Sequence, residues 1–183
     1  MAIKHFICTI IAVGLLICVK GKAQDKYFTK AGKIEFAAIK HHDVNALSRS
    51  AIVAFDTKTG EFQFSILVKS FEFNKAYMQE KFNNQILESD QFPKAMFKGN
   101  IENPSSVNYQ KDGNYPVQVK GELTMHGITK DITARGTLSI SKGIIVAKST
   151  FTVLLDDYNI SNPGIGDGNI SIAVDCNLEL IKN

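Results

Sequence analysis

Residues 117–140, VQVKGELTMHGITKDITARGTLSI, decide the fold. On both sides of His126-Gly127, apolar residues alternate with polar ones, so every second side chain lies on one face of an extended strand. Gly127 supplies the positive φ that a tight turn requires. The stretch is therefore predicted to form a β-hairpin with one apolar and one polar face. That pattern is typical of antiparallel sheets, because the strands of parallel sheets are buried on both faces.

The same alternation recurs from residue 33 to the end of the chain, at 33–38, 61–69, 145–155 and 170–180. Turn sequences rich in Gly and Asn separate the runs and join them into a meander. The run 145–155 would extend about 36 Å as a strand. Roughly eight long strands with one apolar face must close into a barrel or pair as a sandwich. Strand length favours the barrel, because closure removes the exposed edges.

One segment, 74–88, departs from the alternation. Met78, Phe82 and Ile86 recur at intervals of four, which places them on one face of a helix. Asn74 is suited to cap the first turn of that helix. We therefore predict one helix of about three turns between strands. Its apolar stripe faces the core, or covers one mouth of the barrel as a gate.

The N-terminus has the layout of a secretory signal peptide. Lys4 precedes an uncharged apolar run at 6–19, and small residues follow before Gln24. The alternative is a transmembrane anchor, but the run is shorter than the roughly 20 residues that a span requires. We predict that residues 1–23 are cleaved and that 24–183 form a single periplasmic or secreted domain without stable membrane insertion.

Cleavage would also change the charge balance. Residues 1–23 contain three lysines and no acidic residue, so the basic count falls from 21 to 18 and equals the 18 acidic residues. A formal charge of zero gives no support for nucleic-acid binding. Only Cys176 remains of the cysteines, so no disulfide within the chain is predicted, and a buried, inert thiol is expected. The sequence leaves open whether the chain forms a homodimer.

Short motifs occur in a fixed order along the chain after residue 70. They are FEF (71–73) with LESDQFPKAMFKG (87–99), VKGELTMHGITKD (119–131), DYNI (157–160) and IGD (165–167). On these motifs, the chain resembles the YceI-like family over nearly all of 27–181. Asn159 stands where that family usually has Gly, and Asn also tolerates a left-handed turn.

The resemblance implies an exported, lipocalin-like antiparallel barrel. It also implies a ligand, because members of this family are associated with long isoprenoid chains, including quinone-like molecules, held along the barrel axis. The sequence itself leaves this open, since an eight-stranded barrel can either fill its interior with side chains or hold one small ligand. The inward positions carry both large Phe and Leu residues and small Gly and Ala residues, and none in the clear strands is charged.

Three sets of candidate site residues follow from the apolar faces and the resemblance. The lumen lining is predicted to include Phe36, Phe62, Phe64, Ile66, Phe97, Val119, Gly121, Leu123, Leu138, Phe151, Val153 and Val174. The candidate headgroup or mouth contacts are His126, Tyr158 and Asn159. The candidate gate is Met78, Phe82 and Ile86.

Other residues that could carry chemistry have simpler structural interpretations. Neighbouring residues on a strand point to opposite faces, so His41-His42-Asp43 cannot readily chelate a metal and Asp156-Asp157 cannot act as an acid–base pair. The Gly-rich segment 164–168 leads into a strand and lacks the Lys-Ser/Thr of a phosphate loop. His126 has no nucleophile near it in the sequence. We predict no catalytic residue, no metal and no required cofactor.

Two functional hypotheses remain, and an enzyme is a weaker third. The first is an exported lipid-binding protein that holds a polyisoprenoid or isoprenoid quinone in its lumen, for storage, transport or protection of that ligand. The second is a filled β-barrel that acts through its surface as an interaction or stress-response module. A continuous apolar cavity distinguishes them, because only the first hypothesis requires one.

Overall fold

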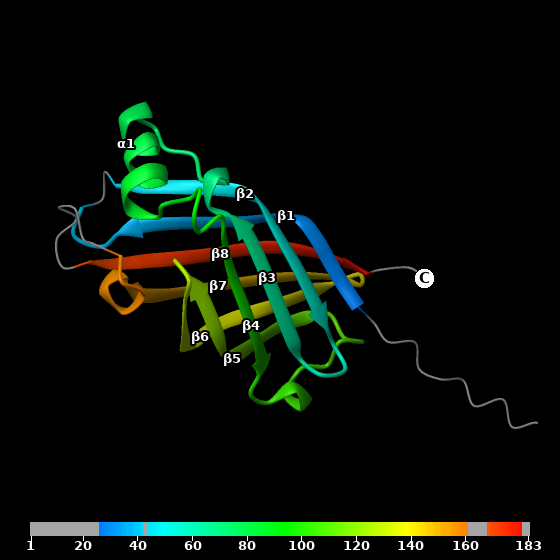
Figure 1. Ribbon diagram of the computed structural model, residues 1–183. Coiled ribbons are helices and arrows are strands. Elements are labelled where there is room, and N and C mark those ends of the chain that lie inside the picture. Colours follow the sequence, from blue (N-terminus) through cyan, green and yellow to red (C-terminus); the bar gives the residue numbers. More distant parts are fainter. Residues whose placement is uncertain (1–25, 42–43, 161–167, 181–183) are drawn as a thin grey trace, which may run out of the picture.

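The computed structural model describes residues 26–41, 44–160 and 168–180. Eight antiparallel strands form one closed barrel in chain order, and the last strand pairs with the first (Figure 1). The strands are β1 (Lys26–Ala38), β2 (Asn45–Asp56), β3 (Glu61–Leu67), β4 (Lys94–Ile101), β5 (Gly113–Met125), β6 (Ile128–Ser141), β7 (Ile144–Leu154) and β8 (Asn169–Leu180). The predicted barrel is thereby confirmed. The predicted signal peptide, the His42-Asp43 pair and residues 164–167 lie outside the described residues.

The predicted helix is present but shorter and less regular than 74–88. Its first part, α1 (Ala76–Lys81), continues into one π-helical turn, η2 (Phe82–Ile86), in which the Leu87 amide donates to the Phe82 carbonyl at 2.9 Å. The N-cap is Lys75, and no side chain caps the helix, so the prediction for Asn74 is wrong. Three short 3-10 helices complete the connections: η1 (Val68–Ser70), η3 (Pro104–Ser106) and η4 (Leu155–Tyr158).

The β5–β6 hairpin has the turn that its sequence predicts. His126 and Gly127 have φ values of 52° and 74°, as a two-residue type I′ turn requires. Gly127 is also restricted by packing, because a Cβ there would lie 2.8 Å from the Phe92 ring. The hairpin is paired along its whole length, from Met125–Ile128 at the turn to Gly113–Ile140 at the open end.

One end of the barrel, where β1 begins, is filled by large side chains. The Phe55 and Phe62 rings stack at 4.0 Å between centroids, and Tyr109 lies 5.9 Å from Phe55. Ile145 and Leu178 are fully buried in the same region. Cys176 is also fully buried, as expected, and burial raises the pKa of its thiol to about 12. The barrel therefore has a packed floor, and any hollow must lie toward α1.

Candidate ligand-binding cavity

A cavity of about 430 Å³ lies between the packed floor and the end of the barrel that carries α1. Its lining is almost wholly apolar, and all eight strands except β2 contribute to it. Eleven of the twelve residues predicted for the lumen line it: Phe36, Phe62, Phe64, Ile66, Phe97, Val119, Leu123, Leu138, Phe151, Val153 and Val174. These inward positions thus surround an empty space instead of filling it.

Gly121 is the predicted lumen residue that does not line the cavity. It is paired with Gly99 across β4 and β5, and a Cβ on Gly121 would lie only 2.3 Å from the Gly99 Cα. The two glycines therefore allow close strand contact in the wall. A missing side chain here provides room for backbone and adds no space for a ligand.

The helix stands over one end of the barrel (Figure 1), and its residues contribute to the cavity lining. Met78, Phe82 and Ile86, the predicted gate residues, all line the cavity. Phe82 is buried and stacks on Phe36 of β1 at 5.2 Å, with Phe73 at 4.9 Å on another side. This aromatic cluster fixes the helix to the barrel, so the apolar stripe forms part of the cavity wall.

Three polar side chains at this end were not predicted as ligand contacts. His41, Tyr77 and Lys81 also line the cavity. Tyr77 is 61% exposed, and Lys81 lies one residue before the buried Phe82. The only available signal was the position of Tyr77 and Lys81 beside the apolar stripe, since polar residues next to a core-facing stripe sit at its edge. Together, His41 and Tyr77 place two hydrogen-bonding groups at the mouth of the cavity, and Lys81 places one cation there.

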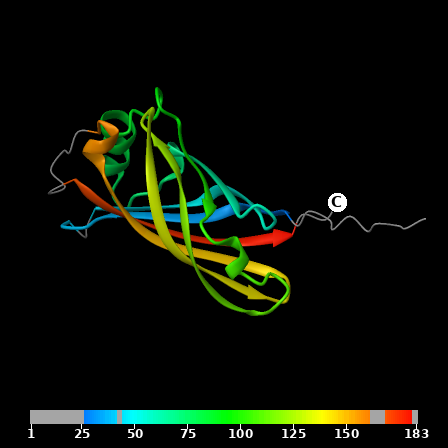
Figure 2. The same ribbon diagram turned by 90° about the horizontal axis from the view of Figure 1, so that it is seen from below.

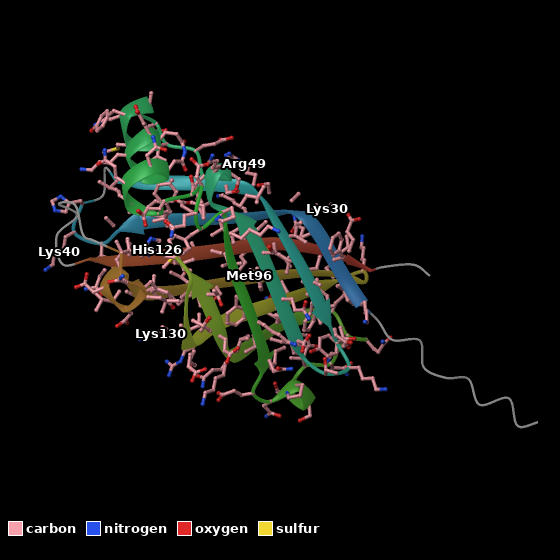
Figure 3. All side chains as sticks on the ribbon, viewed as in Figure 1. Lys30, Lys40, Arg49, Met96, His126 and Lys130 are labelled. Carbon is pink, nitrogen blue, oxygen red and sulfur yellow. The ribbon has the colours of Figure 1, made fainter. Side chains whose placement is uncertain are left out.

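The three candidate headgroup residues lie outside the cavity lining. The imidazole of His126 contacts Glu88 Oε2 through Nε2 at 3.0 Å and the Tyr158 carbonyl through Nδ1 at 3.2 Å. Each ring nitrogen therefore lies within hydrogen-bonding distance of one acceptor oxygen. The Phe92 ring packs on the imidazole at 4.3 Å. His126 therefore ties the hairpin tip to η4 and to the loop after η2. Figure 3 labels His126 at the tip of the β5–β6 hairpin.

Tyr158 and Asn159 also have structural roles. Tyr158 is 1% exposed, and its hydroxyl is buried without a hydrogen-bond partner in the described part of the chain. Burial, with a smaller effect from Asp157, raises the pKa of Tyr158. Asn159 adopts the left-handed conformation, φ 52° and ψ 35°, that its motif predicted. Both residues shape the end of η4 and do not face the lumen.

Within 26–41, 44–160 and 168–180, no three His, Cys, Asp or Glu side chains come together as metal ligands. No helix in those ranges has the length and apolar character to cross a bilayer.

An antiparallel eight-stranded barrel with a packed floor, an apolar hollow and a helix over its mouth is the architecture of a small-molecule-binding barrel. The chain belongs to the YceI-like domain family, whose sequence model matches residues 26–180. No curated protein matches the chain.

Several solved structures share the fold. A polyisoprenoid binding domain from Saccharophagus degradans, described as implicated in plant cell wall breakdown, aligns with a TM-score of 0.72 at 13% identity, over 86% of this chain and 99% of that one. BcnA from Burkholderia cenocepacia aligns with a TM-score of 0.62 at 17% identity, over 82% and 96%. The YCEI protein of Campylobacter jejuni gives 0.56 at 14% identity, over 100% and 92%.

Proposed function

We propose that this chain is an exported lipid-binding protein that holds a long apolar ligand, of the polyisoprenoid or isoprenoid quinone class, in the barrel lumen. The apolar cavity of about 430 Å³ carries this proposal. Pockets for small molecules usually measure about 300–1,000 Å³ and combine apolar walls with a few polar groups. Family membership and the fold shared with a structure described as a polyisoprenoid binding domain support the same ligand class.

The lining explains why a chain-like ligand would be preferred. The floor, formed by Phe62 and the rings behind it, is closed, whereas the opposite end carries His41, Tyr77 and Lys81. A linear hydrocarbon can fill such a channel from the closed floor upward while its polar end stays outside the apolar lining. Each added isoprene unit removes more apolar surface from water, at about 25 cal/mol per Å². Affinity should therefore rise with chain length until the cavity is full.

In this proposal the protein binds and does not catalyse. It stores, transports or protects its ligand, it requires no cofactor, and its partner is a hydrophobic small molecule. A surface-acting interaction or stress-response module would have no use for the cavity, so the hollow interior is the observation that favours binding.

Native mass spectrometry of residues 24–183, purified from a bacterial periplasm, tests the proposal. We expect a stoichiometric adduct that organic extraction releases as a long-chain isoprenoid. Titration with isoprenoid alcohols of 10, 15 and 20 carbons should then give decreasing Kd. A bare mass that stays bare after incubation with quinones and polyprenols would refute lipid binding.

A matched pair of variants locates the site. Ala147→Phe places a ring in the cavity, because Ala147 is a buried lining residue of β7. Ala37→Phe makes the same change at a half-exposed position of β1 that alternates with the buried Ala38. We expect the first variant to lose the longest ligand and the second to bind it as the unmodified protein does.

A further inference from the structure

The ladder between β6 and β7 covers only part of the two strands. These strands pair only from Gly136–Ser149 to Ser141–Ile144. Beyond that point the rest of β6 stays paired with β5, and the rest of β7 stays paired with β8. The last link between the two strands is the Ser149 hydroxyl, which donates to the Arg135 carbonyl at 2.8 Å. Figure 2 shows the β5–β6 hairpin swinging away from β7.

We call the stretch over which β6 and β7 are not paired with each other the parting, and a hydrogen bond bounds it at each end. The link from Ser149 to Arg135 closes one end, and the contact between the His126 imidazole and the Tyr158 carbonyl closes the other. Ile132 on β6 and Phe151 on β7 lie along the parting, line the cavity and are only half-buried. At these two residues the apolar interior meets the outside of the barrel.

An open groove on the outer surface lies across the barrel wall from the cavity at this place. The groove crosses the outer faces of β6, β7, β8 and β1. Five residues border both the groove and the cavity: Gly136, Thr137, Lys148, Ser149 and Val174. Gly136 adds no side chain to the wall, and a Cβ there would lie 2.5 Å from the Lys148 carbonyl oxygen. The backbones of β6 and β7 are therefore in close contact at Gly136, and the five shared residues form the wall between the two spaces beside the end of the ladder.

The groove has an excess of positive charge. Lys148 pairs with Asp175 at 3.2 Å, and Lys33 pairs with Glu35 at 4.0 Å. Arg135 lines the same groove and pairs with no carboxylate of the described chain; its Nε donates to a neighbouring glutamine side chain at 3.4 Å. The exposed guanidinium therefore has donors available for an anion. Its planar fork matches the oxygens of a phosphate or carboxylate.

We propose that the ligand lies with its apolar chain in the lumen and passes between β6 and β7, so that an anionic, phosphate-like head binds Arg135 in the outer groove. This inference rests on the proposed function and adds a head chemistry to it. The Ser149 hydroxyl, at the border of the two spaces, lies at the last pair of the ladder, where the passage begins. The competing arrangement places the head at the other opening, beside Lys81.

Retinol and retinyl phosphate provide the test, because they share one isoprenoid chain and differ only in the head. Their Kd values for the full mature chain are measured by retinoid fluorescence at low salt, where charge interactions are weakly screened. We expect retinyl phosphate to bind about tenfold tighter or better, as a charged hydrogen-bonded pair provides. Arg135→Gln should remove that preference, and Arg135→Lys should keep part of it. Lys81→Gln and the control Arg49→Gln, an exposed arginine on β2, should leave it unchanged.

The outcomes separate the two proposals. If neither retinoid binds, lipid binding fails and the head site fails with it. If both bind equally, or if Lys81→Gln and not Arg135→Gln removes the preference, the lumen stands and the side passage is refuted. The variant Thr150→Cys, at an exposed groove residue, adds an independent readout. Retinyl phosphate should slow the reaction of this thiol with a maleimide, whereas the thiol of Thr129→Cys, at an exposed position of the hairpin, should react at an unchanged rate.

Discussion

Truncation of two stacked phenylalanines at the barrel floor should reduce the folding stability of the protein by different amounts. Phe55 and Phe62 are 1% and 3% exposed and stack at 4.0 Å, so they are matched in residue type, burial and contact. Only Phe62 borders the cavity. We expect Phe55→Ala to destabilise the protein more than Phe62→Ala, although both remove the same ring.

The expected difference follows from the space that each ring leaves. Both variants lose the transfer free energy of a buried phenylalanine, about 1.5–3 kcal/mol. Phe55→Ala also leaves a closed void in packed surroundings, which brings the loss to about 3–5 kcal/mol. Phe62→Ala merges its space with an existing hollow of about 430 Å³ that solvent or ligand can enter. Its loss should stay near about 2–3 kcal/mol.

Urea denaturation of residues 24–183, followed by circular dichroism, measures both losses. Thermal denaturation provides a check, because a difference of about 1–2 kcal/mol between the variants would separate their melting temperatures by about 2–8 °C in a domain of this size. The ligand provides a second readout, because Phe62→Ala deepens the channel and should accept a longer isoprenoid, whereas Phe55→Ala should not. Equal losses of stability, or a larger loss for Phe62→Ala, would show that the floor does not separate packed core from hollow lumen.

Three further perturbations test other parts of the structure. Because burial raises the Cys176 pKa from 9.0 to about 12, the native thiol should resist Ellman's reagent at about pH 8. The contribution of the neutral thiol to folding stability, complete below pH 9, should be lost as pH rises toward 12. Gly121→Ala places a Cβ 2.3 Å from the Gly99 Cα and should cost about 3 kcal/mol in urea denaturation, whereas Gly113→Ala, with no neighbour nearer than 3.5 Å, should cost under about 1 kcal/mol. His126→Ala removes two hydrogen bonds at the hairpin tip and should cost about 1–3 kcal/mol, with faster hydrogen exchange confined to the hairpin and η4.

The sequence was sufficient to predict the barrel because alternation is a local property. The polarity of each residue from Val117 to Met125 indicates whether its side chain faces the core or solvent. Closed pairing of all eight strands follows from the need to bury the apolar faces. The helix was predicted less well, because its start and its π-helical turn depend on distant residues. The stacking of Phe82 on Phe36 fixes the segment to β1, and no nearby residue in the sequence indicates that contact.

The site was predictable only as a face of the barrel. The alternation of side chains along the strands identified the inward residues, and most of those predicted for the lumen line the cavity. The alternation does not show which inward residues meet the packed floor or a facing backbone. Gly121 illustrates the second case, since it has an inward position and no free space. The parting of β6 from β7 was not predictable either, because the alternation runs unbroken through 128–140 and 145–155.

Side-chain size explains why the hollow and the parting occur together. On β6 the inward series decreases from Leu138, which is 1% exposed near the floor, to Gly136 and Ala134 beside the parting. On β7 it decreases from Ile145 at the floor to Ala147 and Ser149. Ala134, Ala147 and Ser149 widen the lumen near the end of the ladder, whereas Gly136, like Gly121, makes room for the neighbouring backbone. A larger side chain at Ala134, Ala147 or Ser149 would shorten the channel and obstruct the passage, so ligand length and access to the outer groove should change together in such variants.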